Sequence, residues 1–187
     1  MGAQKVITIF GSSSILQATK EYTDAHELGF ALAKQGFIVC NGGYGGAMEA
    51  TARGAKEAGG TTIGITAKVF GDKVLNRWID REICVEGHLD RLQTLIATGD
   101  AFVVLRGGTG TLLEFIAVWE LINKRMIEKK NIILFGDFWS ELTAMIKETI
   151  AIDGQTGEME WLKIAHHAKG VTDILNEHFF GNGNSRS

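Results

Sequence analysis

Three times along this chain, a short apolar run ends in a cluster of small residues and a helix-like stretch follows. The three segments read IFGSSS at 9–14, CNGGYGGAMEA at 40–50 and LRGGTGTLLEF at 105–115. Apolar runs of strand length that alternate with helical stretches are typical of a parallel sheet covered by helices on both faces. The repeated junction therefore predicts a doubly wound α/β fold.

Hydrophobic periodicity divides the rest of the chain into the same two kinds of segment. It predicts a Rossmann-like α/β protein, with residues 1–180 as a single nucleotide-binding domain and 181–187 as a disordered tail. Residues 67–80 are expected to form a loop, and 158–168 a loop or an edge strand. The expected strands are 5–10, 37–41, 61–66, 81–85, 101–105 and 131–135, and the expected helices are 21–35, 47–58, 89–98, 112–127, 140–150 and 171–180.

The net charge and the length of the apolar segments limit the kinds of partner that we expect for such a fold. The formal net charge is −3 and the sequence pI is about 6.0, which argues against electrostatic binding of a nucleic acid polymer. No apolar segment reaches the roughly 18 residues that a membrane span requires, and no signal peptide precedes the first strand. We therefore expect a cytoplasmic protein with no membrane partner.

Cysteine and histidine show no metal-ligand spacing. Cys40 and Cys84 both lie in apolar runs, so we predict buried free thiols. His166 and His167 are adjacent, and adjacent residues do not share a face of a helix or a strand. We expect neither a metal site nor a cofactor.

The glycine-rich junctions predict a phosphate site. A strand-to-helix loop directs the first backbone N–H groups of the helix into the crevice, and glycine lets the backbone approach an anion closely. Neither the dinucleotide fingerprint nor the P-loop pattern is present, so a mononucleotide or a sugar phosphate is the expected ligand. The alternative is that these glycines only turn the chain. The candidate binding residues are Gly11, Ser12, Ser13, Gly42, Gly43, Gly45, Gly46, Gly107, Gly108, Thr109, Gly110 and Thr111.

Glu114 and Arg91 are the candidate catalytic residues. Glu114 follows the third glycine loop in a segment, 112–122, that is apolar on nearly every face, so the helix is expected to be buried all round. A carboxylate there is a candidate acid, base or charge stabiliser. The alternative is a capping box between Thr111 and Glu114. Chain order brings Arg91 toward the same crevice, and its alternative is a surface helix arginine.

Two neighbouring residues are open to two interpretations. Arg106 is either an exposed residue at a strand end or a phosphate contact. His88 precedes Arg91 and is expected to be a turn residue.

These residues resemble the Lonely Guy (LOG) family, often described as lysine decarboxylase-like. The family signature P-G-G-x-G-T-x-x-E stands here as RGGTGTLLE at 106–114, and Gly11-Ser12-Ser13 matches the opening loop. Three residues differ from the family pattern. Arg106 replaces the motif proline, Leu92 replaces the motif lysine, and Asn41 stands where many members have glycine. The helix pattern Y-x-x-A-x-x-L-G-x-x-L-A-x-x-G is matched by Tyr22, Ala25, Leu28, Gly29, Leu32, Ala33 and Gly36.

The resemblance implies a nucleoside 5′-monophosphate phosphoribohydrolase of the cytokinin-activating type, which releases a free base and ribose 5-phosphate. It implies catalytic roles for Arg91 and Glu114. It also supports a homodimer packed through 112–127, a helix with too few polar positions for the surface of a monomer; the alternative is that 171–180 covers this helix within one chain. The alternative in the wider superfamily is a non-catalytic nucleotide-binding or molybdenum cofactor carrier protein. No lysine has a recognisable pyridoxal phosphate site around it, so decarboxylation is not implied.

Overall fold

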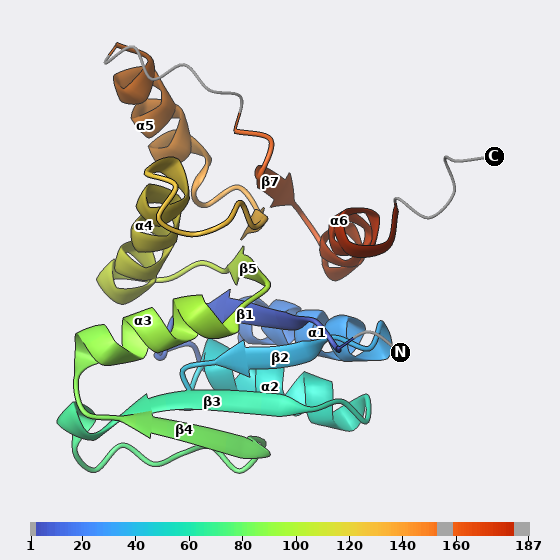
Figure 1. Ribbon diagram of the computed structural model, residues 1–187. Coiled ribbons are helices and arrows are strands. Elements are labelled where there is room, and N and C mark those ends of the chain that lie inside the picture. The colour runs from blue at the N-terminus through green and yellow to red at the C-terminus, as the bar shows by residue number, and fades with distance from the viewer. Residues whose placement is uncertain (1–2, 153–158, 182–187) are drawn as a thin grey trace.

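A seven-stranded parallel sheet forms the centre of the computed structural model, which describes residues 3–152 and 159–181 (Figure 1). The strand order is β4-β3-β2-β1-β5-β6-β7, and every neighbouring pair is parallel. The strands are β1 (Val6–Phe10), β2 (Ile38–Asn41), β3 (Thr62–Ala67), β4 (Arg81–Val85), β5 (Ala101–Val104), β6 (Ile132–Phe135) and β7 (Leu162–Ala165).

Helices cover both faces of this sheet. One apolar cluster joins the sheet to α1, α2 and α6, and the other joins it to α3, α4 and α5. A 3-10 turn, η1 (Lys68–Phe70), follows β3. The helices are α1 (Lys20–Lys34), α2 (Ala47–Glu57), α3 (His88–Thr98), α4 (Thr109–Asn123), α5 (Ser140–Ile152) and α6 (Ala168–Phe180).

The central strands are apolar on both sides because both faces are buried. In β1, Ile7 and Ile9 belong to the cluster on the α1 side, whereas Phe10 belongs to the opposite cluster. β5 alternates in the same way, with Val103 on the α1 side and Phe102 on the other. This explains why these strands read as continuous apolar runs in the sequence.

The order in which strands are added to the sheet reverses at β1. The strands β2, β3 and β4 are added on one side of β1, and β5, β6 and β7 on the other. The loops that follow β1 and β5 therefore leave the sheet toward opposite faces. In open α/β sheets the crevice at such a point is where ligands bind.

The predicted fold class is confirmed, and several local predictions need correction. The helix predicted at 112–127 is α4, which begins at Thr109 and ends at Asn123. It ends there because Arg125 has a positive φ of 56°, a left-handed conformation that a helix cannot contain. The segment 158–168 contains β7, an edge strand as one alternative held. Apart from Gly181, the predicted tail at 181–187 lies outside the described residues.

The prediction that both cysteines are buried is wrong for one of them. Cys40 is buried in β2, but Cys84 is exposed. Cys84 lies in β4, which is an edge strand and has only one neighbouring strand. An apolar run in the sequence does not reveal whether its strand lies at the centre or at the edge of the sheet.

No helix among the described residues is long and apolar enough to cross a membrane.

Candidate functional site

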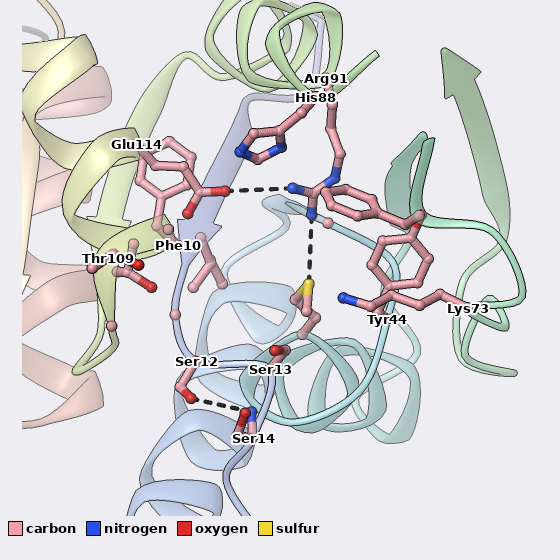
Figure 2. Close-up of a pocket in the computed structure, with 18 residues that line it drawn as sticks. Phe10, Ser12, Ser13, Ser14, Tyr44, Lys73, His88, Arg91, Thr109 and Glu114 are labelled. Atoms are coloured by element: carbon pink, nitrogen blue, oxygen red, sulfur yellow. Dashed lines mark hydrogen bonds and ion pairs between the residues drawn. The ribbon is translucent and has the colours of Figure 1, made fainter. Parts of the chain in front are cut away.

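A cavity of about 310 Å³ lies at the crevice between the carboxyl ends of β1 and β2 and the start of α4 (Figure 2). The loop after β1 contributes 11–14, and the loop after β5 and the first turn of α4 contribute 108–111. Side chains from α3, α4 and η1 complete its walls. The cavity therefore joins the three glycine-containing segments that stand out in the sequence.

Most of the predicted site residues line this cavity, and four do not. The lining includes Gly11, Ser12, Ser13, Gly42, Arg91, Gly108, Thr109, Gly110, Thr111 and Glu114. The four outside it are Gly43, Gly45, Gly46 and Gly107.

Two of the glycines outside the lining hold the loops together. Gly46 has a φ of 66°, and a Cβ there would lie 2.5 Å from the Ser12 carbonyl oxygen. A Cβ at Gly107 would overlap the Thr111 hydroxyl. These positions require glycine for the close approach of neighbouring loop atoms.

Of the three junctions, the one before α4 presents consecutive residues of its helix N-terminus to the cavity. Gly108, Thr109, Gly110 and Thr111 all line it at the start of α4, where the first backbone N–H groups have no partner within the helix. At the start of α2, the Ala47 N–H donates instead to the Ser12 carbonyl at 2.8 Å. The first N–H group of α2 therefore bonds the neighbouring loop, while Met48 in the same turn lines the cavity.

The junction after β1 differs from the one before α4. Helix α1 begins only at Lys20, after an N-cap by Thr19, so nine residues separate it from the end of β1. Its first turn, with Lys20, Glu21 and Asp24, lines a second cavity of about 230 Å³ and not the first one. The serines of this loop reach the candidate site, but the helix start does not.

Arg91 and Glu114 face each other inside the candidate site. Arg91 Nη1 lies 3.6 Å from Glu114 Oε1, and the two side chains are 8% and 13% exposed. Arg91 Nε donates to the Ile65 carbonyl at 2.7 Å, and Nη2 lies 3.7 Å from the Met48 sulfur. Anchored at β3, the guanidinium extends its free edge toward α4, as Figure 2 shows.

Burial changes the proton affinity of both partners. It raises the pKa of Glu114 to about 7, and the charge of Arg91 opposes this shift. Burial also lowers the pKa of Arg91, and the charge of Glu114 opposes that shift. A carboxyl with a pKa raised by burial beside a specific charged partner is typical of functional sites.

The capping-box alternative for Glu114 is wrong. Helix α4 begins two residues before Thr111, with Gly108 as its N-cap and no side-chain capping bond. Glu114 therefore lies beyond the first turn. The prediction that α4 is buried all round is also wrong within the chain, because Leu113 is 42% exposed.

Asn41 and Leu92 occupy structural positions. Asn41 is fully buried, its Nδ2 donates to the Met48 carbonyl at 2.9 Å, and its Oδ1 accepts from the Gly43 N–H at 2.8 Å. It therefore fastens the second loop to α2. Leu92 packs in the core between α3 and the sheet.

Sequence reasoning missed an aromatic and cationic part of the wall. Tyr44 and Phe70 line the cavity and meet edge to face at 5.8 Å. The Arg91 guanidinium lies 5.6 Å from both rings, and Lys73 Nζ lies 4.8 Å from the Phe70 ring. His88 lines the cavity as well, although it was expected to be a turn residue. Tyr44 inside a glycine loop was the available signal, because a large aromatic is unusual in a segment that only turns.

Arg106 points away from the candidate site. Its side chain is 62% exposed, lies 3.4 Å from Glu21 and stacks 4.9 Å from the centre of the Phe138 ring. Its carbonyl accepts from the Ser12 N–H at 3.3 Å. The side chain is thus the exposed strand-end residue of the first interpretation.

Comparison with known proteins places this site in a family. A sequence model of the SLOG cluster4 family matches residues 4–158. A cytokinin riboside 5′-monophosphate phosphoribohydrolase from Mycobacterium tuberculosis is 37% identical over 97 residues, which are 51% of this chain and 52% of that protein. A protein of the same name from Mycobacterium marinum is 31% identical over 123 residues, 65% of each chain.

Solved structures share the fold. A molybdenum cofactor binding protein from Rippkaea orientalis has a TM-score of 0.73 at 23% identity, covering 94% of this chain and 98% of that one. DNA processing protein A from Streptococcus pneumoniae has a TM-score of 0.61 at 16% identity, covering 91% of this chain and 61% of that one. At such identities the likeness concerns the fold alone.

Proposed function

This chain belongs to the SLOG cluster4 family, and on that premise we propose that it hydrolyses the N-glycosidic bond of a nucleoside 5′-monophosphate. The products would be a free base and ribose 5-phosphate. The observation that carries the proposal is the buried Arg91–Glu114 pair beside the N-terminus of α4. The phosphoribohydrolase names of the two mycobacterial relatives support it.

The start of α4 would bind the 5′-phosphate. Gly108, Thr109, Gly110 and Thr111 offer backbone N–H groups and two hydroxyls, and the helix dipole favours an anion at this end. Ser12 and Ser13 approach from the loop after β1. A phosphate bound there would lie about one helical turn from Glu114, and the ribose would lie next to the carboxyl.

Glu114 would act on the ribose carbon that carries the base. The C1′–N bond breaks with its electron pair on the base, and the transition state resembles an oxocarbenium ion. In its ionised form, Glu114 stabilises this positive charge and takes a proton from the water that attacks C1′. The base nitrogen gains a proton, so water is consumed and no other reactant is needed.

Arg91 would orient Glu114 and interact with the ribose or the departing base. The Ile65 carbonyl holds its Nε, so the guanidinium remains directed at the carboxyl. A cation beside a buried carboxylate also favours the ionised form that the reaction requires.

A panel of nucleoside 5′-monophosphates, incubated with the purified protein, tests the proposal. Free base detected by chromatography, together with ribose 5-phosphate, is the expected result. Binding without release of base would instead favour a carrier of a nucleotide or a phosphorylated pterin-type cofactor. Tighter binding of AMP than of adenosine would support the phosphate site, and equal affinity would contradict it.

We further propose that the protein is a cytoplasmic homodimer that packs through α4. Leu113 is 42% exposed on this helix, and Ile116 and Ala117 are only half-buried, so an apolar stripe is left on the outer side. A second copy would cover it by two-fold packing. Light scattering tests this: a particle of one chain mass at micromolar concentration contradicts the dimer, and a folded Ile116→Glu monomer would locate the interface.

A further inference from the structure

Two buried side-chain polar atoms among the described residues have no hydrogen-bond partner, and one of them belongs to the wall of the candidate site. They are His88 Nδ1 and Trp119 Nε1. Buried polar atoms are nearly always hydrogen-bonded, so each exception requires an explanation. The Trp119 ring packs against Trp161 at 5.9 Å in the core beneath α4. The His88 ring lines the cavity together with Arg91 and Glu114.

The position of His88 is set without a hydrogen bond from its ring. It is the first residue of α3, and the Asp90 side chain fixes the helix start by accepting from the Gly87 N–H at 2.9 Å. The imidazole meets the Phe70 ring edge to face at 5.3 Å. Figure 2 shows the ring directed into the cavity, on the side of Glu114. Packing thus holds the ring in the cavity wall, with Nδ1 buried beneath the surface and without a partner.

We infer that His88 is a specificity-determining residue that hydrogen-bonds the base of the bound nucleotide. This inference rests on the proposed function for the identity of the ligand as a nucleotide. The phosphate end of the cavity is the start of α4, and Glu114 follows it by one turn. His88 comes from a different helix and stands beside Phe70 and Tyr44, whose rings suit a planar partner.

The chemistry of the imidazole in the cavity wall fits a heteroaromatic base. In a neutral imidazole one ring nitrogen donates and the other accepts a hydrogen bond, depending on the tautomer. Ring nitrogens and exocyclic amino groups of bases offer both kinds of partner. Ribose hydroxyls and phosphate oxygens also hydrogen-bond an imidazole, so a probe that lacks the base is needed to separate base recognition from binding of the rest of the nucleotide.

Calorimetry with two probes tests the inference. AMP contains the base, the ribose and the phosphate, whereas ribose 5-phosphate lacks the base. We expect His88→Ala to weaken AMP binding about five- to tenfold, as for the loss of one or two buried hydrogen bonds, and to change ribose 5-phosphate binding less than about twofold. His88→Asn, with an amide near the Nδ1 position, should recover part of the loss. Leu89→Ala, a change of a 65%-exposed neighbour on the same helix, is the matched control and should alter neither affinity.

Three outcomes would overturn the inference. Equal losses for both probes would mean that His88 shapes the phosphate or ribose end. Unchanged AMP binding in His88→Ala would mean that the imidazole has no ligand contact. If the wild-type protein binds AMP no better than ribose 5-phosphate, the base contributes nothing to the affinity. None of these measurements needs turnover, so absence of hydrolysis would contradict the proposed function while leaving this test intact.

Discussion

Two arginine–glutamate pairs adjoin the loop between β5 and α4, and they share nearly the same length in opposite surroundings. Arg91 and Glu114 are 3.6 Å apart with side chains 8% and 13% exposed, whereas Arg106 and Glu21 are 3.4 Å apart with side chains 62% and 42% exposed. Burial raises the pKa of Glu114 to about 7. The N–O distance is thus nearly the same in both pairs, and it is burial that raises the pKa of the Glu114 carboxyl.

The largest expected effect is on turnover in Glu114→Gln. Removing the ionisable group should lower kcat by about a thousandfold, the scale of acid–base and charge-stabilising contributions. The fold should persist, because glutamine has the shape of the protonated glutamate that burial favours. We expect a change of only about 1 kcal/mol in the free energy of unfolding at pH 6.

Release of free base and thermal unfolding measure these two effects side by side. Glu21→Gln, in the exposed pair, is the matched control and should retain full activity. Normal turnover in Glu114→Gln with a lower melting temperature would show that the buried pair is only structural.

The second effect comes from Gly42, whose hydrogen faces the guanidinium of the buried pair. A Cβ at this position would overlap Arg91 Nη2 and lie 2.6 Å from the Met48 sulfur. Because Ile65 holds Arg91 Nε, the guanidinium must turn away from Glu114. We expect Gly42→Ala to lower kcat/KM by about ten- to a hundredfold and the free energy of unfolding by about 1–3 kcal/mol.

Gly45→Ala provides the control for that change within the same loop. A Cβ there comes no closer than 3.8 Å to the Ser13 carbonyl, which is ordinary contact. Its activity should be close to that of the wild type. If Gly42→Ala is equally active, Arg91 does not need its observed position for the reaction.

The third effect is a pH dependence expected from the buried pair. The folded-state pKa of Glu114 lies above its ordinary value, at about 7, so the folded protein binds a proton that the unfolded chain releases. The resulting stability is present in full below the ordinary pKa and is lost as the pH rises through about 7. Activity should follow the opposite course, because the ionised carboxylate is the reactive form.

Melting temperatures and kcat/KM between pH 5 and 8 measure this dependence. We expect the wild type to lose on the order of 2 kcal/mol relative to Glu114→Gln across that range. Glu21→Gln should keep the slope of the wild type. Parallel stability curves for the wild type and Glu114→Gln would show that Glu114 titrates at its ordinary pKa.

The sequence supported the fold and the pairing of Arg91 with Glu114 for local reasons. Apolar strand runs and helical periods are visible residue by residue, and parallel strands bring their carboxyl ends to one edge. Arg91 precedes β5 and Glu114 follows it, so chain order alone brings both toward the loop at 105–109.

The remaining features depend on contacts between distant segments. Nothing local shows that Cys84 lies in an edge strand, or that the start of α1, which the sequence predicts to within one residue, lies away from the candidate site. The sequence predicts His88 as a turn residue, whereas its place in the cavity wall depends on Phe70, which η1 brings next to it. Whether a glycine lines the cavity, as Gly42 does, depends on the side chain that approaches it from another element.

The smallest effects on stability and activity are expected for substitutions in the exposed pair, Arg106 and Glu21. Solvent screens Arg106 and Glu21, so their coupling energy in a double-mutant cycle of Arg106→Ala and Glu21→Gln should stay below about 1 kcal/mol and decrease with added salt. Arg106→Ala also loses the stacking on Phe138, which makes it slightly more destabilising than Glu21→Gln. Activity should remain within about twofold in both, because the Arg106 side chain does not line the cavity and its carbonyl, which accepts from the Ser12 N–H, is unchanged. A tenfold loss of kcat/KM in Arg106→Ala alone would instead mean that this arginine turns toward the bound phosphate, so that exposure would no longer separate the two pairs.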